Sequence, residues 1–264
     1  MKKIKCATVG NGLLEGKVVF LTGGSAGIGL ECAKAYALEG AQVVVCAPDE
    51  ADARQAATSL GDRHRGIGCD VSVGSQVESA IGSILTDFGR LDAIHNNAGI
   101  ASPSKALHET SEEEWDALFS INLKGVYWTT RYGINALKAS RGCILNTSSL
   151  VGEIGQNLHA AYSATKGGMN ALTKSMALDY AEHSIRVNAV CPAGVWTPML
   201  RKWAGDQPDP SKITRYLDDI HPLGDCPEGD VIADACVFLL SEKARFVTGH
   251  IMRVSGGAEL GYRR

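Results

Sequence analysis

The sequence of 264 residues contains no uninterrupted run of about 18 apolar side chains, the length that a membrane-spanning helix needs. Gly10, Asn11 and Gly12 interrupt the segment behind the basic N-terminus, and we expect no secretion signal there. The net charge of −3 gives no polybasic surface for nucleic acid or anionic lipid. We therefore expect a cytoplasmic protein that binds neither nucleic acids nor membranes.

Cysteine pairs of the kind found in zinc sites are also missing. The eight cysteines are scattered along the chain, and none forms a CxxC motif. Cys46, Cys143 and Cys191 lie in or beside apolar runs, which is typical of reduced cysteines in a cytosolic protein core. We expect no metal site.

No linker, repeat or low-complexity tract divides the chain, and short apolar runs alternate with helical patterns throughout. Strands are predicted at 17–21, 42–47, 65–69, 91–95, 143–146, 185–190 and 251–254. This alternation predicts an α/β fold with a doubly wound, Rossmann-type parallel sheet of seven strands, helices on both faces, and one domain over residues 1–264. Residues 1–15 are predicted to form an N-terminal arm, and the proline-rich segment 193–222 a substrate flap with one or two short helices.

The first predicted strand runs directly into a glycine-rich turn at residues 22–29, and a helix follows. Glycines let the backbone approach a pyrophosphate, and the start of a helix offers unpaired N–H groups and the positive end of its dipole. The context of strand, turn and helix therefore predicts a dinucleotide site. A second helix is predicted over 111–139, starting with a capping box at Ser111 and Glu114 and carrying Asn122 near its middle.

Tyr162 and Lys166 stand four residues apart in a helix predicted over about 160–180, and they share one helix face. A neighbouring ammonium favours the phenolate, and we expect it to lower the pKa of Tyr162 from the usual ~10. Such a tyrosine can take a proton from an alcohol or give one to a carbonyl. A Ser149 hydroxyl nearby can hold the same substrate oxygen. Taken alone, this spacing is more typical of an ordinary surface helix.

Together with Asp70, the run Asn96-Asn97-Ala98-Gly99 and the Pro192-x-Gly194 motif, these marks resemble the short-chain dehydrogenase/reductase family over nearly the whole chain. The resemblance implies a catalytic tetrad of Asn122, Ser149, Tyr162 and Lys166. In it Tyr162 is the acid/base, Lys166 tunes its pKa and contacts the nicotinamide ribose, Ser149 orients the substrate, and Asn122 holds a relay water. The neighbouring Ser148 is a rival for Ser149, but the family's spacing to the tyrosine favours Ser149.

The resemblance also implies which residues contact the cofactor: Gly23, Ser25, Gly27, Ile28, Gly29, Asp70, Val71, Asn97, Ala98, Gly99, Tyr162, Lys166, Pro192, Gly194, Val195 and Thr197. Neither usual signature of cofactor choice is intact. Ala47 stands where relatives that use NAD often have Asp, while Ala26 and Pro48 stand where users of NADP often have Arg or Lys. Acidic residues follow the second strand and would repel a 2′-phosphate, which favours NAD. NADP remains an alternative if Arg54 turns inward.

These features predict an NAD(P)-dependent oxidoreductase that transfers a hydride between the cofactor and a secondary alcohol or ketone. We expect a small polar substrate such as a sugar-derived acid, bound by Ser149, Gln156, Tyr162, Trp196 and Arg201. In this hypothesis Arg201 grips a carboxylate, although an ordinary solvated surface position is an equally good interpretation. The alternatives are a 3-oxoacyl thioester reductase using NADPH and a non-catalytic NAD(P)-binding regulator. The resemblance further implies a homotetramer.

Overall fold

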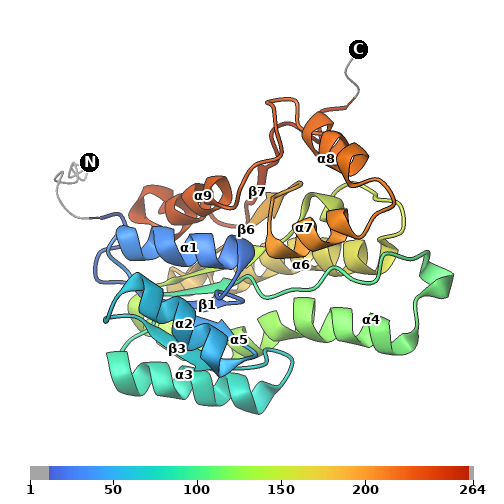
Figure 1. Ribbon diagram of the computed structural model, residues 1–264. Helices are drawn as coiled ribbons and strands as arrows, with labels where there is room; N and C mark the ends of the chain where they lie inside the picture. The colour runs from blue at the N-terminus through green and yellow to red at the C-terminus, as the bar shows by residue number, and fades with distance from the viewer. Residues whose placement is uncertain (1–11, 262–264) are drawn as a thin grey trace.

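The computed structural model describes residues 12–261, and these form one seven-stranded parallel sheet (Figure 1). Its strands are β1 (Val18–Thr22), β2 (Gln42–Ala47), β3 (Arg65–Gly68), β4 (Ala93–Asn96), β5 (Cys143–Thr147), β6 (Arg186–Pro192) and β7 (Ile251–Val254). They lie in the order β3-β2-β1-β4-β5-β6-β7, and every neighbouring pair is parallel. The predicted doubly wound sheet is confirmed. Most of the predicted arm over 1–15 lies outside the described residues.

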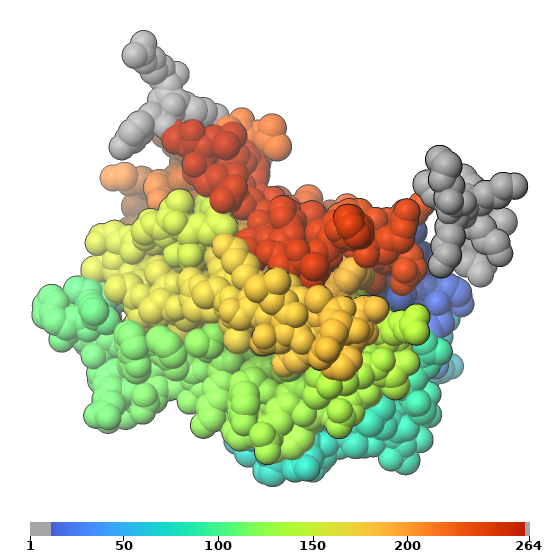
Figure 2. All heavy atoms as spheres, turned by 180° about the vertical axis from the view of Figure 1, so that it is seen from behind, coloured from blue at the N-terminus to red at the C-terminus, as the bar shows by residue number. Residues whose placement is uncertain are grey.

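Helices cover both faces of the sheet. One face carries α1 (Gly27–Leu38), α2 (Glu50–Leu60) and α9 (Asp230–Leu240), and it faces the viewer in Figure 1. The other carries α3 (Gly74–Phe88), α5 (Gly125–Ser140) and α6 (Ala160–Asp179), and Figure 2 shows this side from behind. A hydrophobic core lies on each face of the sheet, and β1 contributes side chains to both, because they alternate between the faces. Val19 and Leu21 pack on the α1 side, and Val18 and Phe20 on the α3 side.

The carboxyl ends of the strands meet at one rim of the sheet. β1 pairs with both β2 and β4, and the chain winds away from this centre in opposite directions, which makes the β1/β4 edge the switch point of the fold. The motifs that follow β1, β4, β5 and β6 therefore converge on the same rim. Within the described residues, no helix is long and apolar enough to cross a membrane.

The helix predicted over 111–139 is interrupted. It begins as α4 (Glu112–Phe119) with the expected capping box, in which the Ser111 hydroxyl accepts from the Glu114 N–H and the Glu114 carboxylate accepts from the Ser111 N–H. A π-helical turn (Ser120–Lys124) then separates α4 from α5. The turn carries Asn122, whose side chain is fully buried. π-Turns inside helices are common at functional sites.

The proline-rich segment 193–222 contains two short helices, α7 (Pro198–Gly205) and α8 (Pro210–Asp219), as predicted. Each starts with proline in its first turn, and a side chain caps each start: Thr197 for α7 and Asp209 for α8. Figure 1 shows both helices standing beyond the carboxyl ends of the strands.

Gly29 in the first turn of α1 marks the closest approach of two backbone segments in the glycine-rich turn. A Cβ added here would lie 2.0 Å from the Gly23 carbonyl oxygen and 2.6 Å from Nδ2 of Asn97. Neither group can move freely, because they are hydrogen-bonded to each other at 3.0 Å. The helix can therefore begin this close to the turn only with glycine at position 29.

We expect Gly29→Ala to displace the glycine-rich turn, lower the free energy of unfolding by about 1–3 kcal/mol and weaken cofactor binding. Gly82 provides the matched control, because it also lies in a helix but nothing surrounds the place of its Cβ within 4 Å. Gly82→Ala should be neutral or stabilising by up to about 1 kcal/mol. Denaturant unfolding and a cofactor titration measure both effects. Equal stability of the two variants would contradict the close approach.

Candidate active site

The start of α1 is open to an anionic ligand. Ala26 occupies the N-cap position, no side chain caps the helix, and its first turn carries no acidic residue. The first N–H groups of a helix lack intrahelical partners. Gly23 and Gly27 bend the turn with positive φ angles of 63° and 53°. These observations fit the pyrophosphate of a dinucleotide. The other two predicted contacts, Ser25 and Ile28, lie in the same segment and are partly exposed.

Asn97 ties the loop after β4 to the turn after β1. Its Nδ2 donates to the carbonyl oxygens of Thr22 and Gly23 at 3.1 and 3.0 Å. Its Oδ1 accepts from the Thr147 hydroxyl at 3.3 Å. The backbone N–H groups of Asn97 and Ala98 both donate to the Thr22 hydroxyl. Asn97 therefore holds three strand ends together, and its side chain has a positioning role in addition to any contact with the cofactor.

Asn122 fixes the next part of the same loop. Its Oδ1 accepts from the Ile100 N–H at 2.8 Å, and its Nδ2 donates to the Ile100 carbonyl at 2.9 Å and to the Thr165 hydroxyl at 3.1 Å. Gly99 passes between Asn122 and Lys166, since a Cβ there would lie 3.2 Å from Asn122 Oδ1 and 3.6 Å from Lys166 Nζ. The buried amide is fully bonded, and the predicted relay water remains a prediction.

Lys166 reaches from α6 to the end of β5. Its Nζ donates to the Thr147 carbonyl at 2.7 Å, and the side chain is 3% exposed. The ammonium lies 5.7 Å from the centroid of the Tyr162 ring. The four-residue spacing thus places both side chains on one face, as predicted.

The two neighbouring serines have different surroundings. The Ser148 hydroxyl is buried and donates to the Lys166 carbonyl at 3.2 Å, a backbone-bonding position. Ser149 is partly exposed, and its hydroxyl is the hydrogen-bonding partner that lowers the pKa of the Tyr162 phenol. The structure therefore brings Ser149, and not Ser148, to the tyrosine oxygen.

The expected direction of the Tyr162 pKa is wrong for the protein alone. Burial raises the pKa of Tyr162 to about 12, and the Ser149 hydrogen bond only partly opposes it. Burial also lowers the pKa of Lys166 to about 8. The physical reason is that the Lys166 side chain is buried and the Tyr162 side chain is partly buried, which disfavours each charged form. Lys166 loses its proton at a lower pH than Tyr162, and its charge is gone before the phenol ionises.

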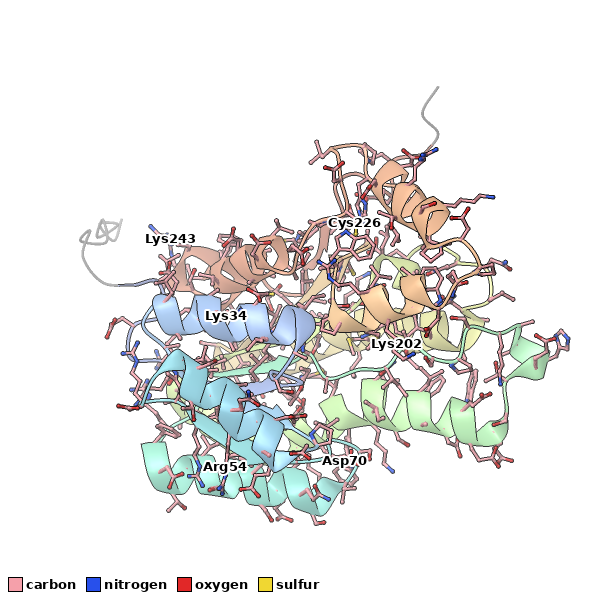
Figure 3. The ribbon with its side chains drawn as sticks, in the orientation of Figure 1. Lys34, Arg54, Asp70, Lys202, Cys226 and Lys243 are labelled. Carbon is pink, nitrogen blue, oxygen red and sulfur yellow. The ribbon has the colours of Figure 1, made fainter. Side chains whose placement is uncertain are left out.

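The remaining predicted cofactor contacts lie along the rim. Pro192 ends β6, and Gly194 and the buried Val195 follow it beneath the flap. A Cβ at Gly194 would lie 3.3 Å from Sγ of Cys226, which Figure 3 shows beneath α8. Thr197 lies beside the glycine-rich turn, because a Cβ at Gly27 would approach it to 3.2 Å.

Asp70, labelled in Figure 3, and the next residue, Val71, follow β3 at the other end of this rim. The Asp70 carboxylate accepts from the backbone N–H and hydroxyl of Ser72 at 2.9 and 2.7 Å. Val71 is buried against Gly125, the first residue of α5. The predicted adenine side thus consists of a loop that is ordered by its own hydrogen bonds.

Arg201 does not stand free in the flap. Its guanidinium pairs with the Glu228 carboxylate and lies over the ring of Trp196, 5.1 Å from the ring centroid. The backbone N–H of Trp196 donates to the Pro227 carbonyl at 2.8 Å. The structure therefore shows an assembly of Trp, Arg and Glu in place of the free cation that the sequence analysis expected. Gln156 lies exposed in the loop before α6.

Sequence reasoning missed His95 on β4. Its ring is fully buried, with Nε2 2.8 Å from the Thr147 hydroxyl and Nδ1 2.9 Å from the Tyr36 hydroxyl. A histidine inside a short apolar strand two residues before Asn97 was the available signal. Its hydrogen bond reaches the same Thr147 whose carbonyl holds Lys166.

Comparison with known proteins agrees with this geometry. A family model described as enoyl-(acyl carrier protein) reductase matches residues 23–259. The chain is 42% identical to the L-fucose dehydrogenase of Bos taurus over 249 residues, 94% of this chain and 92% of that protein. The solved aldohexose dehydrogenase of Thermoplasma acidophilum is 33% identical with a TM-score of 0.87, covering 97% of this chain and 98% of that one.

A 3-ketoacyl-(acyl-carrier-protein) reductase from Brucella melitensis, solved in complex with NADH, is also 33% identical, with a TM-score of 0.85 over 93% of this chain and 99% of that one. The chain belongs to the short-chain dehydrogenase/reductase family. It is an oxidoreductase that acts on CH–OH groups with a nicotinamide cofactor. For this short-chain dehydrogenase, the thioester-reductase and regulator alternatives are not favoured.

We expect Tyr162→Phe to lower kcat by at least ~10²-fold, because the variant keeps the ring but lacks the proton carrier. Cofactor affinity should be retained, since the phenol oxygen is the only group removed. Steady-state rates and a cofactor titration measure the two effects separately. Turnover near that of the unmodified protein would exclude Tyr162 as the acid/base.

The two serines give an internal comparison for the same assay. Ser149→Ala should lower kcat by roughly 10–10²-fold, because its hydroxyl faces the reacting oxygen. Ser148→Ala should retain most of the turnover, because that hydroxyl is bonded to the backbone of Lys166. The reverse order of the two rates would assign the role to Ser148.

The buried Lys166 should make stability depend on pH. Its pKa is about 8 in the folded protein and ~10.4 in an unfolded chain, so the unfolded chain binds more protons between these values. The cost of burying the ammonium is therefore full below pH 8 and disappears as the pH approaches ~10.4. Relative to Lys166→Met, the unmodified protein should gain unfolding free energy over this window, by about 3 kcal/mol in total. Urea unfolding of both proteins at about pH 7.5, 9 and 10 measures the difference between their free energies of unfolding. A constant difference would contradict the lowered pKa.

Proposed function

We propose that this dehydrogenase oxidises a hydroxyl group of a small neutral sugar, an aldose of the L-fucose kind, and prefers NAD as the hydride acceptor. The observation that carries the proposal is the pairing of Arg201 with Glu228, which neutralises the cation expected to select a carboxylate. Trp196 beside this pair offers an aromatic surface, and the paired charges offer hydrogen bonds, both suited to an uncharged polyol. The similarity to an L-fucose dehydrogenase and an aldohexose dehydrogenase supports the same substrate class.

The residues of the rim would divide the work as follows. The bound cofactor supplies the hydride acceptor. The Ser149 and Tyr162 hydroxyls hold the sugar hydroxyl, and Tyr162 receives its proton. In the protein alone the phenol is a weak acid, since burial raises its pKa to about 12. Oxidation of the hydroxyl releases a proton through Tyr162, and a higher pH favours this release, so oxidation should proceed faster at pH values of about 8–9 than at about pH 6.

The preference for NAD follows from the charges after β2. The Asp49 carboxylate caps α2 by accepting from the N–H groups of Ala51 and Asp52, and Glu50 pairs with Arg54. Arg54 was the cation that could have accepted a 2′-phosphate, and its pairing leaves this side acidic. An additional phosphate here would meet carboxylates and no unpaired partner among these residues.

We also infer that residues 193–222 act as a flap over the substrate and that the chain assembles as a homotetramer. The flap carries α7 and α8 across the rim, as described above. The tetramer is supported by apolar side chains on the outer faces of α5 and α6: Tyr127 is 47% exposed and Leu178 is 81% exposed.

The substrate experiment compares L-fucose with its aldonic acid, using NAD and NADP in turn and following the reduced nicotinamide. We expect kcat/KM to be at least about tenfold higher for the sugar than for the acid, and at least about tenfold higher with NAD than with NADP. A higher value for the acid would contradict the neutral substrate. A higher value with NADP would contradict the charge argument after β2.

Arg201→Met tests the assembly of Trp196, Arg201 and Glu228 in the same assay. We expect KM for the sugar to rise by roughly 2–10-fold with little change in kcat, because stacking and pairing are lost while the chemistry remains. Lys202→Met is the matched control, since Lys202 is exposed on the same helix and pairs with Asp206. Equal KM values for the two variants would remove Arg201 from the substrate site.

A further inference from the structure

Three potential metal ligands meet in the core between α1, β4 and α9. The Sγ atoms of Cys32 and Cys236 and a ring nitrogen of His95 all lie within 4.8 Å of one another. All three residues are fully buried. They come from positions far apart in the sequence, so no short spacing between ligands, such as a CxxC motif, indicates this cluster.

The two thiols differ from other buried cysteines of this protein. Cys46, Cys143 and Cys191 donate their thiol protons to protein oxygens. Cys32 and Cys236 instead lie with their Sγ atoms within 4.8 Å of each other and of a ring nitrogen of His95. Two thiols and an imidazole nitrogen gathered this closely are an arrangement that suits a thiophilic cation.

The hydrogen bonds of His95 leave the correct nitrogen for such a cation. The Thr147 hydroxyl donates to Asn97, so it accepts from Nε2–H of His95 at 2.8 Å. This fixes the proton on Nε2 and leaves a lone pair on Nδ1, which faces the Tyr36 hydroxyl at 2.9 Å. Metal-binding histidines characteristically donate their other N–H to a neighbouring acceptor.

Tyr36 completes the set. It lies four residues after Cys32 on α1, on the same helix face, and its oxygen adjoins His95 Nδ1. Two thiolates, one imidazole and one oxygen are a tetrahedral donor set for Zn²⁺. In a zinc site with bonds of about 2.0–2.3 Å, the donors lie roughly 3.3–3.8 Å apart. The two thiols and the imidazole therefore need to approach one another by up to about 1 Å, and the Tyr36 oxygen, now 2.9 Å from Nδ1, needs to move slightly outward.

We propose that Cys32, His95 and Cys236, with Tyr36 as the fourth donor, bind one Zn²⁺ ion that joins α1 and α9 to β4. Binding releases the two thiol protons, and the dication with two thiolates and two neutral ligands has no net charge. A neutral cluster is compatible with full burial, whereas an uncompensated dication is not. The ion is structural, since every donor comes from protein and no position is left for substrate.

The site would also act on the catalytic rim through Thr147. Fixing the His95 ring fixes its bond to the Thr147 hydroxyl, and the Thr147 carbonyl holds the Lys166 ammonium at 2.7 Å. Helix α1, which carries two of the donors, also presents its open N-terminus to the cofactor. The proposed ion therefore stabilises the helix that carries the glycine-rich turn (residues 22–29) without contacting the turn itself.

The test is the metal content of the full-length protein, produced in zinc-supplemented medium, kept reduced and dialysed against metal-free buffer. We expect about one zinc ion per chain in the unmodified protein and in Cys143→Ala, a matched control with an equally buried thiol in the same core. Cys236→Ala and His95→Gln should retain less than about a tenth of this amount. Production with cobalt should give the absorption of a tetrahedral thiolate complex in the unmodified protein, a readout that needs no variant.

Unmodified protein that carries no zinc and gives no thiolate–cobalt absorption overturns the proposal. Equal zinc in Cys236→Ala and in the unmodified protein also overturns it, because the ion would then lie elsewhere. A disulfide between Cys32 and Cys236, found by mass spectrometry in zinc-free protein purified without reducing agent, would assign the pair to a different chemistry and overturn it as well.

Discussion

The hydrogen bond from the Lys166 ammonium to the Thr147 carbonyl is the interaction on which the active rim depends. It joins α6 to the end of β5 and fixes the position of a charge that water would otherwise solvate. Once that charge is fixed, the Tyr162 ring, one helical turn earlier, lies at a set distance from it. The loop passes between Lys166 and Asn122 at Gly99, where an added Cβ would make a tight contact of 3.2 Å with Asn122 Oδ1. The tetrad is thus a consequence of packing around one buried cation.

That cation also explains why the tyrosine cannot be understood from its spacing alone. Four residues of separation place Tyr162 and Lys166 on one helix face, and this much follows from the sequence. Whether the pair lowers or raises the phenol pKa depends on the water that both groups lose on folding. Burial raises the pKa of Tyr162 and lowers that of Lys166, and this desolvation outweighs the attraction that the sequence suggests.

The fold and the shared rim could be predicted because they depend on local patterns. Apolar runs, the glycine-rich turn and the capping box at Ser111 act over a few residues, and each appears where it was expected. The π-turn around Asn122 could not be predicted, since the same side chains fit a regular helix and only contacts with Ile100 and Thr165 favour the wider turn. The pairing of Arg201 with Glu228 was missed for the same reason: the two residues stand 27 positions apart.

Long-range contacts also decide how the two faces of the sheet communicate. Thr147 bonds Lys166 through its carbonyl on the catalytic side and His95 through its hydroxyl on the side of α1. His95 reaches Tyr36 in α1, and the first turn of that helix forms the cofactor cradle. A change in the core around His95 can therefore alter the glycine-rich turn through α1, and the position of Lys166 through Thr147. Proton transfer at Tyr162 and cofactor binding at the glycine-rich turn share this support, and a disturbance of the support should change both together.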